Sequence, residues 1–82
     1  MPVRLPRDLS GHDLAVLLRQ VGYAVSRQSG SHMRLTTQTK GEHHVTIPAH
    51  GSLRLGTLAA ILDEVGRHHG LTRDALVQAL WG

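Results

Sequence analysis

The sequence contains no cysteine and no phenylalanine, and its aromatic residues are one tyrosine and one tryptophan. Without cysteine, neither a disulfide nor a thiolate metal site can hold the fold together. With so few rings, the core is expected to consist of Leu, Val, Ile and Ala side chains, with Tyr23 near its centre. Long apolar runs and a signal-like first segment are also missing. We therefore expect a cytoplasmic protein with no membrane partner.

Lysine is almost absent as well, because eight of the nine fixed cations are arginines and Lys40 is the only lysine. The acidic residues number six, so the chain carries a modest positive charge. Arginine binds phosphate through two parallel hydrogen bonds, and the bias therefore favours a polyanionic partner. An acidic protein partner or a GC-rich coding bias also fits it. The length of 82 residues predicts a single domain over residues 1–82.

An amphipathic helix is predicted in the first third of the chain, after an extended lead-in over residues 1–8. Ser10 is a candidate N-cap, and Asp13 three residues later completes the pattern of a capping box. Gly22 is expected to end the helix in a left-handed conformation. Apolar residues recur between these signals at helical spacing, at Leu14, Leu17, Leu18 and Val21.

Three short stretches then alternate polar and apolar residues, as strands do. They cover residues 23–27, 32–37 and 42–47, with turns at 28–31 and 38–41, which predicts an antiparallel meander. Pro48 ends the last strand because proline cannot donate to the ladder. The residues expected to point inward are, strand by strand, Tyr23 and Val25, Met33 and Leu35, and Val45 and Ile47.

Two more helices are predicted after the strands. The first is expected to begin near Gly56 and to end at Gly66 or Gly70. Its apolar stripe repeats the helical spacing at Leu58, Ile61, Leu62 and Val65. Thr72 can cap a short last helix, whose apolar residues are Ala75, Leu76, Leu80 and Trp81.

The predicted architecture is a two-layer α+β domain of order α-β-β-β-α, with a short extra C-terminal helix. Each long helix has one apolar stripe and the sheet has one apolar face, so both helices are expected to pack on that face. The opposite face of the sheet then stays open. The side chains expected on the open face are His32, Arg34, Thr36, His44 and Thr46.

The sequence resembles the HicA toxins, small ribonucleases of bacterial toxin–antitoxin pairs, from about Leu5 to Leu71. The tripeptide Gly30-Ser31-His32, the Pro-x-His-Gly loop from Pro48 to Gly51 and the helix start Gly56-Thr57-Leu58 carry the resemblance. It implies a fold like that of double-stranded-RNA-binding domains. It also implies messenger RNA as the substrate, His32 as the catalytic residue and a HicB-like antitoxin as the inhibitory partner. The tail after Leu71 is less characteristic of the family.

The residues around His32 suit cleavage of RNA without a metal ion or a cofactor. RNA carries its own nucleophile, the 2′-hydroxyl, and a histidine can accept its proton near neutral pH. Gly30 is expected to leave the approach to the phosphate open, and Ser31 to offer its hydroxyl or its backbone N–H. Arg34 is expected to stabilise negative charge, while Arg27 and Lys40 flank the site and hold the RNA backbone.

The other histidines are weaker candidates. His50 is either a second acid–base group or a residue whose ring hydrogen-bonds its own loop. His43 and His44 are adjacent on a strand and therefore face opposite ways, while His68 and His69 are expected to satisfy helix carbonyls. No third ligand set supports a zinc site. A non-catalytic RNA-binding module and a protein-interaction domain remain alternative functions.

Overall fold

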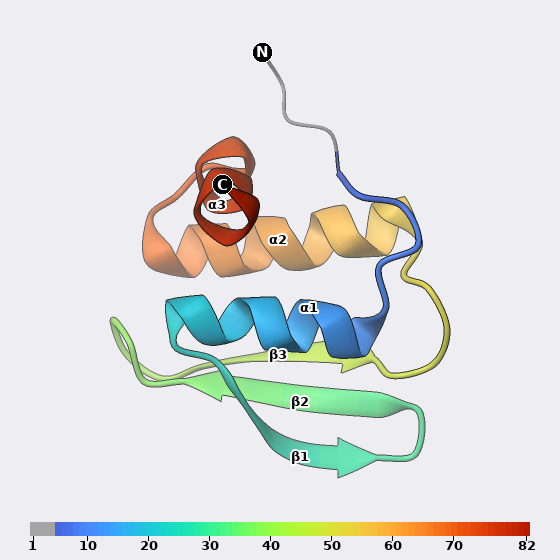
Figure 1. Ribbon diagram of the computed structural model, residues 1–82. Coiled ribbons are helices and arrows are strands. Elements are labelled where there is room, and N and C mark those ends of the chain that lie inside the picture. Colours follow the sequence, from blue (N-terminus) through green and yellow to red (C-terminus); the bar gives the residue numbers. More distant parts are fainter. Residues whose placement is uncertain (1–4) are drawn as a thin grey trace.

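The computed structural model describes residues 5–82, so residues 1–4 of the predicted lead-in lie outside the described part. The element order is α1 (Gly11–Leu18), a 3-10 turn η1 (Arg19–Val21), β1 (Ala24–Ser29), β2 (His32–Thr37), β3 (His43–Pro48), α2 (Leu55–His69) and α3 (Arg73–Trp81). Figure 1 shows the three helices on one side of the sheet. The predicted two-layer α-β-β-β-α arrangement with an extra C-terminal helix is confirmed.

Helix α1 begins at the predicted N-cap, and the 3-10 turn η1 that continues it ends at the predicted Gly22. The Ser10 hydroxyl accepts from the Asp13 backbone N–H at 3.0 Å, and the Asp13 carboxylate accepts from the Ser10 N–H. Gly22 ends the helical segment with a φ of 92°. Leu14 and Leu18 are fully buried, whereas Leu17 and Val21 are only partly buried. Ala15 joins the core instead, so the buried stripe is rotated from the predicted one.

The sheet is antiparallel with the order β1-β2-β3. Met33, Leu35, Val45 and Ile47 are buried beneath the helices, as predicted. Val25 was predicted to point inward and therefore to be buried, but its side chain is 46% exposed. Val25 pairs with the buried Leu35 and so faces the helical side. It stays exposed because β1 is an edge strand that extends beyond the helical layer (Figure 1).

Four strand ends differ from the prediction, because β1 and β3 begin one residue later, at Ala24 and His43, and both also end later. The β1–β2 turn consists of only Gly30 and Ser31, so β1 runs on to Ser29. Pro48 is the last residue of β3 and pairs with His32 at the start of β2. A proline can occupy this place because it is the end of a strand at the edge of the sheet.

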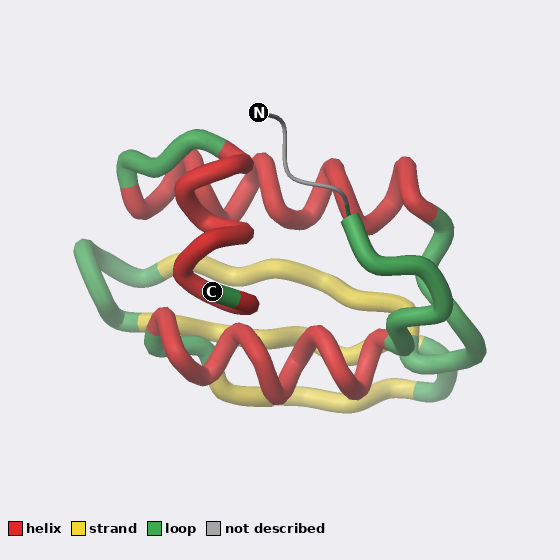
Figure 2. Tube along the Cα trace, turned by 45° about the horizontal axis from the view of Figure 1, so that its top comes forward, coloured by secondary structure: helices red, strands yellow, loops and turns green. Residues whose placement is uncertain are grey.

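Helices α2 and α3 complete the helical layer, and Figure 2 shows α1 and α2 running along the same face of the sheet. The predicted stripe of α2 is buried, and Gly70, with a φ of 72°, ends the helix rather than Gly66. In α3, Leu76, Val77 and Leu80 are buried, whereas Ala75 is exposed and Trp81 is 37% exposed. Thr72 caps α3 through the Ala75 N–H. Within residues 5–82, no helix has the length and apolar character needed to cross a membrane.

Candidate functional site

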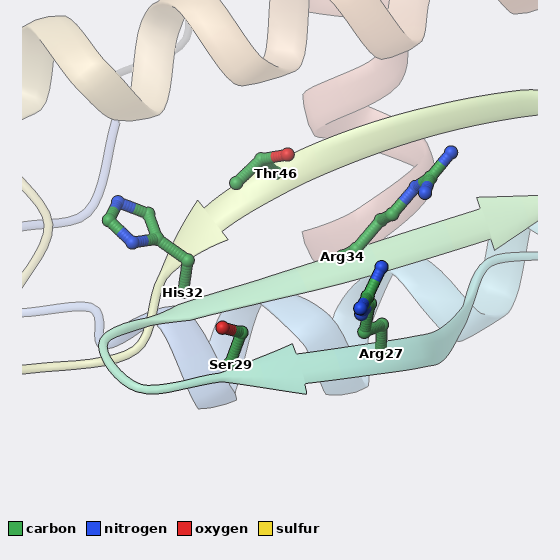
Figure 3. A pocket seen from close by; sticks show the side chains of 5 residues that line it. All are labelled: Arg27, Ser29, His32, Arg34 and Thr46. Atoms are coloured by element: carbon green, nitrogen blue, oxygen red, sulfur yellow. The ribbon is translucent and has the colours of Figure 1, made fainter.

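A shallow hollow of about 240 Å³ lies on the open face of the sheet, at the end where β2 begins. Five side chains from all three strands line it: Arg27, Ser29, His32, Arg34 and Thr46 (Figure 3). The strand register explains this grouping. Ser29 lies opposite His32, and Arg34 lies between Arg27 on one side and Thr46 on the other. Two rows of side chains that run across the strands therefore line the hollow.

His32 is held at the entrance to β2 by the short turn that precedes it. Gly30 adopts a φ of 54°, a left-handed conformation that glycine tolerates best. The His32 ring is exposed, and its Nδ1 lies 3.2 Å from the Ser31 hydroxyl. Among residues 5–82, its Nε2 has no hydrogen-bond partner. One ring nitrogen is thus oriented by a neighbour, while the other is available to a ligand.

Arg27 and Arg34 are directly opposite each other on neighbouring strands, and both side chains are exposed. Within residues 5–82, neither guanidinium forms an ion pair with a carboxylate. Like charges at opposed positions destabilise a sheet, and a bound anion would relieve the repulsion. The pair therefore favours a phosphate or carboxylate ligand.

A β-bulge puts Arg27 on this face. Tyr23 and Val25 face the helices, so strict alternation would send Arg27 to the helical side too. The register shifts between Val25 and Arg27, and Ser26 is the additional residue. The Ser26 hydroxyl donates to the Arg34 carbonyl oxygen at 3.1 Å and lies 2.7 Å from the Thr36 hydroxyl.

The row of side chains next to the hollow is joined by hydrogen bonds. The Thr36 hydroxyl lies 2.7 Å from His44 Nδ1, and His44 Nε2 lies 2.8 Å from the Glu42 carboxylate. The hydrogen bond with His44, followed by one with Gln38, lowers the pKa of Glu42 below its ordinary value. Thr36 and His44 are thus on the open face, as predicted, and they are engaged with one another.

Gly30, Ser31 and His50 lie near the start of β2. The Ala49 N–H donates to the Ser31 carbonyl oxygen at 2.6 Å, so the loop that contains His50 starts beside the β1–β2 turn. The His50 side chain is exposed, and within residues 5–82 its ring makes no hydrogen bond to the loop. Of the two interpretations of His50, the loop-bonding one is therefore not supported.

Lys40 does not lie beside His32, contrary to the prediction. Lys40 lies in the turn after β2, at the far end of this strand from His32. The strand runs from His32 to Thr37 and spans about 17 Å at roughly 3.3 Å per residue. The Lys40 Nζ donates to the His69 carbonyl oxygen at 3.0 Å, at the C-terminal end of α2. The lysine therefore caps a helix on the opposite end of the molecule.

The remaining histidines gather at that same end. His43 Nδ1 lies 2.7 Å from the Tyr23 hydroxyl, and the His43 ring stacks on His68. His43 and His44 do face opposite ways, as predicted. His68 and His69 end α2 rather than follow it, and His68 Nε2 donates to the Thr39 and Gly41 carbonyls of the β2–β3 turn.

His69 is the polar residue of this cluster that lies deepest. It is 7% exposed, and its Nε2 is buried without a partner within residues 5–82. Burial, followed by the charges of His68 and Lys40, lowers its pKa below the ordinary value of 6.5. Across residues 5–82, the structure brings together no group of three or more His, Cys, Asp or Glu residues that could hold a metal ion.

Sequence reasoning missed two residues of the site, Ser29 and Ser26. Ser29 was expected in the turn, but it belongs to β1 and lines the hollow. Ser26 was expected on a regular strand, whereas it forms the bulge. A serine in a strand or at its end is too common to signal either role.

The fold and the site define a class of protein: a small α+β domain whose open, basic sheet face presents an exposed histidine. A family model for the HicA toxin of bacterial toxin–antitoxin systems matches residues 11–73, which is most of the chain. The chain belongs to the HicA toxin family, and it is a toxin of a toxin–antitoxin pair. No match was found among curated proteins or among solved structures. The match ends at the start of α3, so most of that helix lies beyond the family pattern.

Proposed function

We propose that the chain is an endoribonuclease that cleaves messenger RNA in the cytoplasm without a metal ion, and that His32 is its catalytic residue. The observation that carries this proposal is the position of His32. Its ring is exposed at the edge of a hollow, and two arginines lie on the same face. Within residues 5–82, one ring nitrogen has no hydrogen-bond partner and neither arginine has an ion-pair partner.

The reaction begins when His32 accepts the proton of an RNA 2′-hydroxyl. The 2′-oxygen attacks the adjacent phosphorus, and the bond to the 5′-oxygen of the next nucleotide breaks. The products are a 2′,3′-cyclic phosphate and a 5′-hydroxyl, whose proton comes from His32 or from His50. One positioned acid–base group contributes roughly 10²–10⁴-fold to a rate, which suffices for a slow toxin.

Charge stabilisation in this reaction is assigned to the residues beside His32. Arg34 and Arg27 would bind phosphate oxygens and oppose the negative charge that develops on them. Gly30 has no side chain to obstruct the entrance, and in residues 5–82 no atom apart from those of its two chain neighbours lies within 4 Å of the place where a Cβ would be. Ser31 holds the His32 ring through its hydroxyl.

The inhibitory partner is proposed to be a HicB-like antitoxin that covers the open sheet face. A toxin must be held inactive until it is needed, and the hollow is fully accessible in the structure of the single chain. Acidic side chains of the partner would complement Arg27 and Arg34 and speed association.

The test is cleavage of a labelled messenger RNA in the presence of EDTA by the wild type, His32→Ala and His12→Ala. His12 is an exposed histidine on α1 that does not line the hollow, and it serves as the matched control. We expect His32→Ala to lose at least about 100-fold in rate and His12→Ala to cleave normally. A folded His32→Ala chain that cleaves RNA at the wild-type rate contradicts the assignment.

The same assay distinguishes the alternatives when binding of the labelled RNA is measured beside its cleavage. RNA binding without cleavage by the wild type would indicate a non-catalytic RNA-binding module, and neither binding nor cleavage would indicate a protein-interaction domain. A His50→Gln chain that binds RNA but turns over slowly would identify His50 as the second acid–base group.

A further inference from the structure

The bulge in β1 does two things to the open face at once. It places Ser26 and Arg27, which are adjacent in sequence, on the same side of the sheet. It also brings Arg27 directly opposite Arg34. Without the extra residue, Arg27 would point toward the helical side, and Arg34 would face the hollow alone.

Two hydrogen bonds of the Ser26 hydroxyl stabilise the bulge. A bulged residue loses its place in the backbone ladder, so its conformation depends on other contacts. The Ser26 hydroxyl donates to the backbone carbonyl of Arg34, which is the residue that Arg27 faces. The second contact, with the Thr36 hydroxyl, ties the bulge to the next open-face position on β2.

Behind Ser26, the contacts continue through Thr36 and His44 to Glu42. A donor can be assigned to each side-chain hydrogen bond of this row. When both ring nitrogens of His44 carry a hydrogen, Ser26 donates to the Arg34 carbonyl, Thr36 donates to Ser26, and one ring N–H of His44 donates to Thr36. The other ring N–H donates to Glu42. Every contact then has its own donor, and the Ser26 hydroxyl is directed at Arg34.

We propose that Ser26 is a positioning residue, which holds the bulge so that Arg27 and Arg34 form a clamp for an RNA phosphate beside His32. Arg34 is two residues from His32, about 7 Å along β2, so the clamp holds the RNA backbone within reach of the histidine. The ligand is a phosphodiester, because two opposed guanidiniums suit phosphate oxygens. This proposal rests on RNA being the ligand of the proposed function.

The test measures binding of a 2′-O-methylated RNA 12-mer, which cannot be cleaved because its 2′-oxygen carries no proton. Dissociation constants are compared for the wild type, Ser26→Ala, Ser26→Thr, Arg27→Gln and Ser26→Ala with Arg27→Gln. We expect Ser26→Ala to weaken binding about fivefold in the wild-type background and less than twofold when Arg27 is already replaced. Ser26→Thr retains the hydroxyl and should restore the affinity.

An equal loss from Ser26→Ala in both backgrounds would overturn the proposal, as would no loss in either or no binding of the 12-mer by the wild type. Cleavage of unmodified RNA provides the second readout. Ser26→Ala should lower kcat/KM, because a displaced Arg27 binds the phosphate less well and stabilises less of its developing charge, and Ser26→Thr should restore the wild-type value. A chain that shows the coupling but does not cleave RNA contradicts the proposed ribonuclease alone, whereas one that cleaves without the coupling contradicts the clamp alone.

Discussion

Tyr23 is the only tyrosine in the chain and connects the core with the histidine cluster. Its side chain is 1% exposed, and its hydroxyl lies 2.7 Å from His43 Nδ1. Burial, assisted by the negative charge of Glu64, raises the pKa of Tyr23 to about 12. The folded chain therefore keeps the phenol protonated at pH values where the unfolded chain has begun to lose the proton.

The expected consequence is a loss of stability in strong alkali. The unfolded phenol titrates at 10.0, so the stabilisation is complete below pH 10 and is lost as the pH rises toward 12. Phenolate absorbance should appear together with unfolding rather than before it. Tyr23→Phe should flatten this alkaline decline, at a cost near neutral pH of about 1 kcal/mol for the lost hydrogen bond. Phenolate that forms near pH 10 in the folded wild type would contradict the expectation.

At the same scale, the site residues differ in how far the sequence could predict their positions. The alternation of β2 is enough to put His32 and Arg34 on one face, and Thr46 follows from β3 in the same way. Arg27 and Lys40 could not be placed, because their positions depend on the bulge and on the contact between Lys40 and α2. Both are effects of partners far away in sequence.

At the scale of the elements, helix α3 is joined to the rest of the fold by polar contacts near its two ends. The Arg73 guanidinium donates two hydrogen bonds to the Asp63 carboxylate of α2, at 2.8 and 2.7 Å. Gln20 of η1 donates to the Leu80 carbonyl oxygen near the other end of α3. The hydrogen bond from Arg73 lowers the pKa of Asp63 below its ordinary value of 3.8.

Loss of this contact should loosen α3 before it affects the sheet. The stabilisation from Asp63 is present above pH 3.8 and is lost as the pH falls below that value, because the folded pKa is the lower one. At neutral pH, Asp63→Asn should make the amides of α3 exchange several-fold faster with deuterium and leave those of β2 unchanged. Glu64→Gln, on the same turn of α2, is not expected to affect α3. Uniformly faster exchange over the whole chain would show that α3 does not open separately.

The helices and strands were predictable because their signals are local. Caps, glycine stops and the periodicity of the apolar residues all lie within each segment, and they placed each helix and strand to within two residues at most ends. The bulge in β1 and the exposure of Val25 were not predictable, since both depend on how β1 pairs with β2 and on where the helical layer ends.

Over the whole molecule, charge is distributed unevenly. No Asp or Glu occurs between Asp13 and Glu42, a stretch that includes most of α1 and both β1 and β2. That stretch contains four fixed cations: Arg19, Arg27, Arg34 and Lys40. Three of the six acidic residues lie on α2 and α3 instead: Asp63, Glu64 and Asp74. Two of these cations, Arg27 and Arg34, are exposed on the open face of the sheet, so this face attracts a polyanion.

This asymmetry predicts which cations control the salt dependence of RNA binding. The affinity for the methylated 12-mer should fall as salt rises, and Arg27→Gln should reduce the slope of log K against log salt by about 0.7. Arg67→Gln is the matched control, because Arg67 is an exposed arginine on α2 close to Asp63. Equal reductions by both variants would show that binding depends on net charge rather than on the sheet face.

The separation between the open face and the core also has an evolutionary consequence. The side chains of the hollow are exposed, whereas the buried residues of the same strands face the helices. Substitutions at Arg27, Ser29 or Thr46 therefore leave the interior intact, and the two sets of positions can drift independently. Selection by a new antitoxin or a new transcript can change the residues of the open face, while the buried residues on the helical side keep the fold unchanged.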